Sequence, residues 1–149
     1  MSSATPNWSE NVPDWARSLP LPRSSPAHIA PAELAELVRT KTAGVDFLVV
    51  DLRKADWDTA YVRTSVNLPA QSFHQSLPAL LPLLSGVPIV VFYCKACTAV
   101  SRGVRAAAYY QDALDVAGIT TSQARVLTGG IQGWIAQYGE DESLTVKIE

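Results

Sequence analysis

Residues 87–105 decide the fold, and they read VPIVVFYCKACTAVSRGVR. The apolar, β-branched run at 89–93 is too short for a helix and predicts a buried strand. Small and polar residues follow it, and then an Ala- and Tyr-rich segment with helical spacing. A loop therefore connects the end of a strand to the start of a helix, and both cysteines of the chain, Cys94 and Cys97, lie on that loop.

This loop is a candidate anion site, because the first N–H groups of a helix have no partner inside it and carry the positive end of its dipole. A cysteine there ionises more readily, with a pKa of roughly 3.5–7.5 against about 8.5 for an ordinary thiol. Arg102 and Arg105 add positive charge, and a guanidinium can bind an oxyanion through two parallel hydrogen bonds. In the alternative interpretation, Cys94 is only a small apolar residue that ends a buried strand. The local sequence leaves both interpretations open.

Composition restricts the class of protein. The chain has 149 residues, 48% of them hydrophobic, which is enough for one compact domain with a core. A net charge of −2 gives no general attraction to nucleic acid or anionic lipid, so we expect neither as a partner. Two cysteines so close in sequence cannot connect distant parts of a fold, which favours a reducing compartment. With no apolar run near the ~18 residues of a membrane span, we expect a cytoplasmic protein, the nucleus being open as a second location.

The chain divides into an arm and a domain. Residues 1–28 are rich in Ser and Pro and predict an N-terminal arm. We predict that its Trp15 and Leu19 pack on the body, with a partner-binding motif as the alternative. Residues 29–149 form the domain. Its pattern predicts a helix from Pro31, strands at 47–51, 65–69 and 124–127, a helix ended by Gly118, and a last helix with Trp134 in the core. Residues 73–84 contain two prolines and predict short helical turns instead of one helix.

Strands that alternate with helices imply a parallel sheet, in which sites form beyond the carboxyl ends of the strands. Four motifs in order strengthen this prediction, and together they resemble a rhodanese-like domain over about residues 29–138. They are Val49-Val50-Asp51-Leu52-Arg53, Val66-Asn67-Leu68-Pro69, the cysteine directly after the central strand, and Leu127-Thr128-Gly129-Gly130-Ile131-Gln132-Gly133-Trp134. The resemblance implies an α/β, three-layer fold with a small parallel sheet and helices on both faces.

Three segments are similar to one branch of this family, which contains fungal-type arsenate reductases and cell-cycle dual-specificity phosphatases. They are Asp51-Leu52-Arg53, Asn67-Leu68-Pro69-Ala70-Gln71-Ser72 and Phe92-Tyr93-Cys94. The resemblance implies a cysteine that attacks phosphate or arsenate, or that carries a persulfide sulfur. The expected substrate is a small oxyanion or a phosphorylated molecule. Arsenate reduction would need glutathione or a glutaredoxin as thiol reductant, with Cys97 as resolving thiol; no other cofactor is expected.

Loop length separates the branches of the family. In the phosphatase branch that this chain resembles, five residues separate the cysteine from the arginine. In the sulfurtransferases the loop is one residue shorter. Seven residues separate Cys94 from Arg102, whereas four separate Cys97 from Arg102. Position after the strand favours Cys94 as nucleophile, and spacing favours Cys97. We predict Cys94 as nucleophile and Arg102 as oxyanion clamp, with a cradle formed by the N–H groups of Lys95, Ala96, Cys97, Thr98, Ala99, Val100 and Ser101.

Other polar residues have simpler interpretations. The loop has no Asp or Glu to act as general acid. Asp56 and Asp58 could approach it from a neighbouring loop that opens on the same edge of the sheet, but we interpret both as solvated surface. Asp51 and Arg53 are interpreted as a structural pair at a strand end. Tyr93 stands where the phosphatases of the branch usually have His.

Alternative functions stay open at this point. The two cysteines have the spacing of half a zinc site, but only His28 and His74 could complete it, so no metal is predicted. A sulfurtransferase is the alternative enzyme. A non-catalytic binding module with an altered loop is the alternative outside catalysis. The sequence does not predict an oligomeric state.

Overall fold

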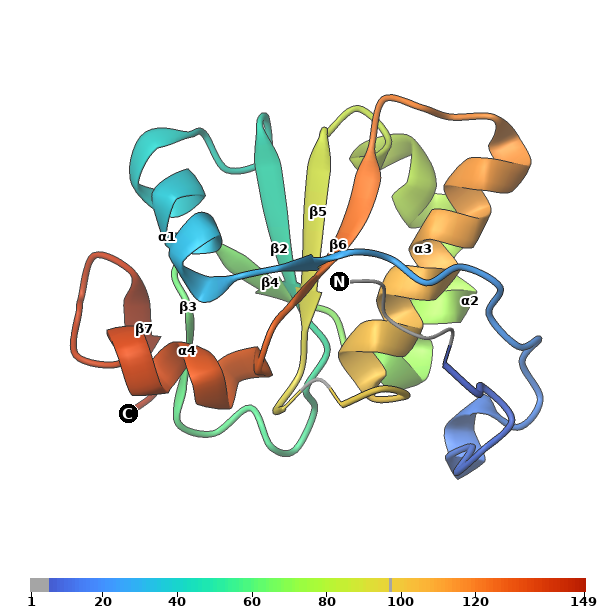
Figure 1. Ribbon diagram of the computed structural model, residues 1–149, viewed down its shortest axis with the longest axis horizontal. Helices are drawn as coiled ribbons and strands as arrows, with labels where there is room; N and C mark the ends of the chain where they lie inside the picture. The colour runs from blue at the N-terminus through green and yellow to red at the C-terminus, as the bar shows by residue number, and fades with distance from the viewer. Residues whose placement is uncertain (1–5, 97) are drawn as a thin grey trace.

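A computed structural model describes residues 6–96 and 98–149 as a three-layer α/β fold (Figure 1). Helices α1 (Pro31–Thr40) and α4 (Gly130–Tyr138) cover one face of the central sheet, and α2 (Ala70–Leu84) and α3 (Arg102–Ala117) cover the other. The sheet contains, in spatial order, β1 (His28–Ile29), β6 (Gln123–Leu127), β5 (Ile89–Tyr93), β2 (Phe47–Asp51) and β4 (Ser65–Asn67). All of its neighbouring strands are parallel, as predicted.

Strand β5 occupies the middle of the sheet, between β2 and β6. Its last four residues are buried without alternation, because helices cover both faces of the sheet. Tyr93 is in register with Asp51 of β2, and Phe92 is in register with Val126 of β6. The carboxyl ends of the three strands therefore lie together, and Cys94 follows directly on the central one.

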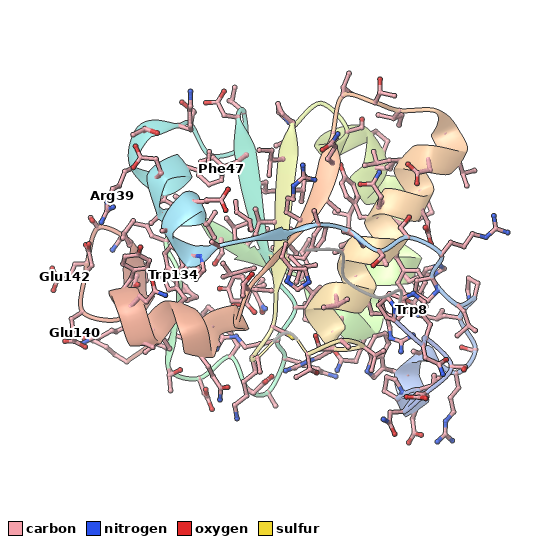
Figure 2. The ribbon with its side chains drawn as sticks, viewed as in Figure 1. Trp8, Arg39, Phe47, Trp134, Glu140 and Glu142 are labelled. Atoms are coloured by element: carbon pink, nitrogen blue, oxygen red, sulfur yellow. The ribbon has the colours of Figure 1, made fainter. Side chains whose placement is uncertain are left out.

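A second, two-stranded sheet pairs β3 (Ala60–Val62) with β7 (Thr145–Lys147) in antiparallel orientation. The sequence did not predict it, because strands of three residues leave almost no pattern. The buried Trp134 of α4 connects this sheet to the domain core, as its indole Nε1–H donates to Thr145 Oγ1 at 2.9 Å (Figure 2). The prediction of Trp134 as a core residue is confirmed.

Helix α2 corrects the prediction of short helical turns, because it runs unbroken through Pro78 and Pro82. The two prolines are four residues apart and therefore share one face of the helix, which is exposed. Water can bond the backbone carbonyls that lose their partners there. Phe73, Leu77 and Leu84 on the other face are buried. Each such side chain contributes about 1.5–3 kcal/mol, which offsets a proline's cost of about 3 kcal/mol.

The N-terminal arm lies against α3 (Figure 1). Trp15 and Leu19 pack on the core as predicted, and Trp8 is buried as well. The arm ends in the sheet, since His28 already pairs with Val126. Within the described part of the chain, no helix has the length and apolar character that crossing a membrane requires.

Candidate active site

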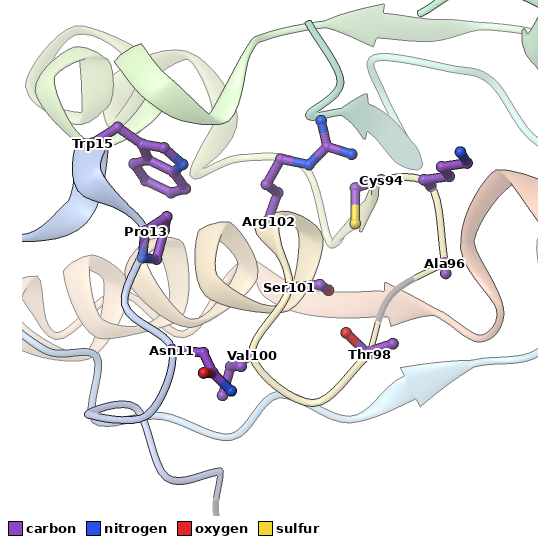
Figure 3. A pocket seen from close by; sticks show the side chains of 10 residues that line it. Asn11, Pro13, Trp15, Cys94, Ala96, Thr98, Val100, Ser101 and Arg102 are labelled. Atoms are coloured by element: carbon purple, nitrogen blue, oxygen red, sulfur yellow. The ribbon is translucent and has the colours of Figure 1, made fainter. Parts of the chain in front are cut away.

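Cys94 and Arg102 line one cavity of about 400 Å³ at the carboxyl end of β5 (Figure 3). Cys94 is the first residue after the strand, and Arg102 is the first residue of α3. The rest of the lining consists of Asn11, Pro13, Trp15, Lys95, Ala96, Thr98, Val100 and Ser101. Of the other predicted cradle residues, Ala99 is exposed and does not line the cavity, and Cys97 lies outside the described residues.

Helix α4 fixes the first half of the loop. The N–H groups of Ile131 and Gln132 donate to the carbonyl oxygens of Cys94 and Lys95 at 2.9 and 3.0 Å. Because a trans peptide is planar, the N–H groups of Lys95 and Ala96 in the same two peptide units point away from α4. Gly130 makes this contact feasible: its φ is +58°, and a Cβ there would lie 2.7 Å from both carbonyl oxygens.

The backbone N–H of Ser101 is not part of the cradle, contrary to the prediction. Its N–H does not face a ligand, because it donates to the carbonyl oxygen of Thr98 at 3.0 Å and closes a turn before α3. Its hydroxyl is different. The Ser101 Oγ is buried and has no hydrogen bond to any residue that the structure describes, although Ser101 lines the cavity. Buried polar atoms nearly always have a partner, so this hydroxyl is a candidate ligand contact.

The predicted structural pair at the end of β2 is confirmed. Asp51 and Arg53 are both buried, and Arg53 Nη2 lies 2.8 Å from Asp51 Oδ2. The same guanidinium donates to the carbonyl oxygens of Asp56 and Ala60, at 3.2 and 2.7 Å. Asn67 Nδ2 donates to the carbonyl oxygens of Asp51 and Arg53. The loop at 54–59 is therefore folded around Arg53, which places Asp56 beside the cavity.

Asp56 forms an ion pair with Arg102, so the interpretation of Asp56 as solvated surface was wrong. Arg102 Nη1 and Nη2 donate to Asp56 Oδ1 and Oδ2 at 2.7 and 2.5 Å. This hydrogen bonding lowers the pKa of Asp56 to about 2 and raises the pKa of Arg102, which the negative charge of Cys94 in its ionised form would raise further. A guanidinium has five N–H groups, so three are not directed at Asp56. Asp58 is exposed, as predicted.

The positions of Asp56 and Arg102 in the sequence already indicated that the two residues could meet. Asp56 follows β2 and Arg102 follows β5, and loops at the carboxyl ends of adjacent parallel strands meet at the same sheet edge.

Tyr93, directly before Cys94, is part of the core. It is fully buried, its Oη accepts the N–H of Val62 at 3.1 Å, and it donates to Ser65 Oγ at 3.4 Å. Burial raises the pKa of this phenol. Tyr93 therefore connects β5 to β3 and β4 as a neutral group and takes no part in lining the cavity.

A family model of the rhodanese-like domain matches residues 30–137, most of the chain. The protein belongs to the rhodanese-like family. No curated protein sequence matches this rhodanese-like protein significantly.

Solved structures resemble this rhodanese-like protein over most of its length. One of Ygr203w, described as a yeast protein tyrosine phosphatase of the rhodanese family, is 25% identical with a TM-score of 0.67 and covers 83% of this chain and 94% of its own. A second, of Saccharomyces cerevisiae Ygr203w, is 26% identical with a TM-score of 0.67, covering 82% and 88%. The As-Sb reductase of Leishmania major, 24% identical with a TM-score of 0.66 and covering 83% and 88%, shares the fold.

The arm contributes a wall of the rhodanese-like domain's cavity that the sequence did not predict. Asn11, Pro13 and Trp15 line it, although we predicted that Trp15 packs on the body. The pairing of an arm with a distant loop leaves no periodic pattern to read. Among residues 6–96 and 98–149, no group of three or more His, Cys, Asp or Glu side chains could hold a metal ion.

Proposed function

We propose that this protein is a cysteine-dependent phosphatase, in which the Cys94 thiolate attacks the phosphorus of a phosphate ester bound at the start of α3. The observation that carries the proposal is that Cys94 and an Asp56-oriented guanidinium share one cavity. The Ser101 hydroxyl and the N–H groups of Lys95 and Ala96 are the further donors for the phosphate oxygens. The similarity to Ygr203w, described as a yeast protein tyrosine phosphatase, supports phosphoester chemistry.

The reaction needs no redox cofactor. A sulfur–phosphorus bond forms as the ester phosphorus–oxygen bond breaks, and the leaving oxygen keeps the electron pair and takes a proton from water. Water then attacks the phosphorus, the phosphorus–sulfur bond breaks, and the thiolate is restored as phosphate leaves. Arg102 compensates the negative charge that gathers on the equatorial oxygens in both steps.

Hydrolysis of p-nitrophenyl phosphate tests the proposal, with Cys94→Ser and Cys97→Ser as matched cysteine variants. We expect hydrolysis that Cys94→Ser abolishes, and a fall of about a hundredfold in kcat/KM for Arg102→Lys, because lysine cannot reproduce the planar fork. Loss of hydrolysis in Cys97→Ser alone would contradict Cys94 as nucleophile. Turnover of thiosulfate with cyanide, or of arsenate with glutathione, without phosphate ester hydrolysis would assign the site to sulfur transfer or arsenate reduction instead.

Titration of the thiolate absorbance separates catalysis from simple binding. We expect a thiolate that forms below pH 7 and that disappears in Cys94→Ser. A protein in which neither cysteine ionises below pH 7 would be a binding module.

A further inference from the structure

We infer that Trp15 of the N-terminal arm is a specificity-determining residue, which selects phosphate esters whose leaving group is a flat aromatic ring. The inference rests on the proposed phosphatase function and names its substrate class. Three features carry it: the fixed position of the arm, the two unlike sides of the cavity, and the absence of a carboxyl or imidazole group among the described lining residues.

The arm is held on both sides of Trp15. Before it, Trp8 is 5% exposed and its ring lies 5.3 Å from the Arg105 guanidinium carbon on α3. After it, Tyr109 Oη donates to the carbonyl oxygen of Pro20 at 2.7 Å, and the N–H of Ser24 donates to Asp112 at 2.9 Å. A segment held at both ends forms a wall of the site.

The loop side of the cavity carries its charged groups, and the arm side carries two rings and the amide of Asn11. Cys94, Ser101 and Arg102 supply the sulfur, the hydroxyl and the guanidinium, whereas Pro13 and Trp15 present rings next to Arg102 (Figure 3). Its volume of about 400 Å³ lies within the range of small-molecule pockets, roughly 300–1,000 Å³. A water molecule occupies about 30 Å³, so a five-atom oxyanion would leave most of this space unfilled. The indole provides a flat surface for a ring attached to the oxyanion.

The leaving group departs without help from a carboxyl or imidazole acid among the described lining residues. The described lining residues include no Asp, Glu or His. Asp56, the carboxylate nearest to Arg102, is held ionised by that guanidinium and cannot donate a proton at neutral pH. An oxygen that leaves as an anion must then be weakly basic. A phenol has a pKa of about 10, whereas water, the closest reference for an alkyl hydroxyl, has about 15.7, so this site should cleave aryl esters faster than alkyl esters.

The test compares phenyl phosphate with methyl phosphate in four proteins: wild type, Trp15→Ala, Trp15→Phe and Leu19→Ala. Leu19 also belongs to the arm and packs on the core, but it does not line the cavity, so Leu19→Ala controls for general loosening of the arm. We expect wild type to prefer phenyl phosphate. Trp15→Ala should lower kcat/KM for phenyl phosphate roughly two- to tenfold, the range of an aromatic contact, and lower it much less for methyl phosphate, so that the ratio of the two esters falls. Trp15→Phe should restore most of the loss, and Leu19→Ala should keep the wild-type ratio.

Binding gives a second readout that does not depend on turnover. In the Cys94→Ser background, calorimetry should show tighter binding of phenyl phosphate than of inorganic phosphate, and Trp15→Ala should remove this difference. An equal loss for both ligands, or an unchanged ratio of the two esters in Trp15→Ala, would overturn the role of Trp15 while leaving the phosphatase proposal intact. Turnover of neither ester by wild type would overturn both.

A phosphotyrosyl peptide and free phenyl phosphate present the same chemistry from two sources. A higher kcat/KM for the peptide would identify a protein substrate, and a higher value for the free ester would identify a small molecule. Either result supports the aryl class. A preference for a phosphoseryl peptide over both would contradict it.

Discussion

The carboxylate of Asp56 and the guanidinium of Arg102, 46 residues apart, form a two-point ion pair at the rim of the cavity. We predict that Asp56→Asn lowers kcat/KM for phosphate esters by about tenfold, because the amide offers one acceptor oxygen in place of two and Arg102 loses its fixed orientation. Unfolding should cost about 1 kcal/mol less, since the pair is partly exposed. Steady-state kinetics and urea denaturation check this. Asp58→Asn is the matched control, and an equal effect there would contradict a specific role for Asp56.

The same pair predicts a pH dependence of stability. The pKa of Asp56 is lowered from 3.8 to about 2 in the folded protein, first by its hydrogen bond to Arg102. A lowered pKa stabilises the folded state fully above the unfolded value, and this contribution disappears as pH falls toward 2. With allowance for solvent exposure we expect a loss of about 1 kcal/mol between pH 5 and pH 2. Urea denaturation at several pH values should show this loss in wild type, and a smaller one in Asp56→Asn.

Gly130→Ala should distort the loop that follows β5, at Cys94 and Lys95. Its Cβ would meet the carbonyl oxygens of Cys94 and Lys95 at 2.7 Å, so the loop or α4 must move. We expect destabilisation by about 2 kcal/mol or more and a loss of hydrolysis. Gly118→Ala is the matched control, because its φ is also positive, +68°, but nothing lies within 4 Å of its Cβ. It should lose about 1 kcal/mol of stability and keep its activity. Equal kinetic effects in both variants would contradict the steric explanation.

Trp8 and Arg105 should respond very differently to substitution. Trp8→Ala removes a buried aromatic ring and should destabilise the protein by about 3 kcal/mol. The three guanidinium nitrogens of Arg105 are buried without a hydrogen bond to any described residue. Replacing such a cation by an apolar side chain of similar length costs little, so Arg105→Met should change stability by less than about 1 kcal/mol. Denaturant unfolding decides this, and a large destabilisation by Arg105→Met would reveal a strong partner of the guanidinium.

The sequence predicted those parts of the molecule that depend on local pattern. The run at 89–93 is apolar throughout because both faces of the sheet are covered. Cys94 follows this run directly in the sequence, so it lies at the carboxyl end of the strand whatever the order of the other strands. Helix α2 was predicted wrongly because the prediction considered only the free-energy cost of a proline within a helix. This helix gains its stability from the buried face opposite Pro78 and Pro82. The pair of Asp56 with Arg102 and the wall around Trp15 depend on segments that meet only after folding, so neither has a periodic signature.

The contact between α4 and the loop after β5 determines when that loop can fold during synthesis. Cys94 leaves the ribosome well before Ile131 and Gln132, whose N–H groups bind the carbonyl oxygens of Cys94 and Lys95. Until those later residues have emerged, the Cys94 and Lys95 carbonyl oxygens of the nascent chain lack these two hydrogen bonds. The loop after β5 can therefore take the conformation of the folded protein only at a late stage of translation.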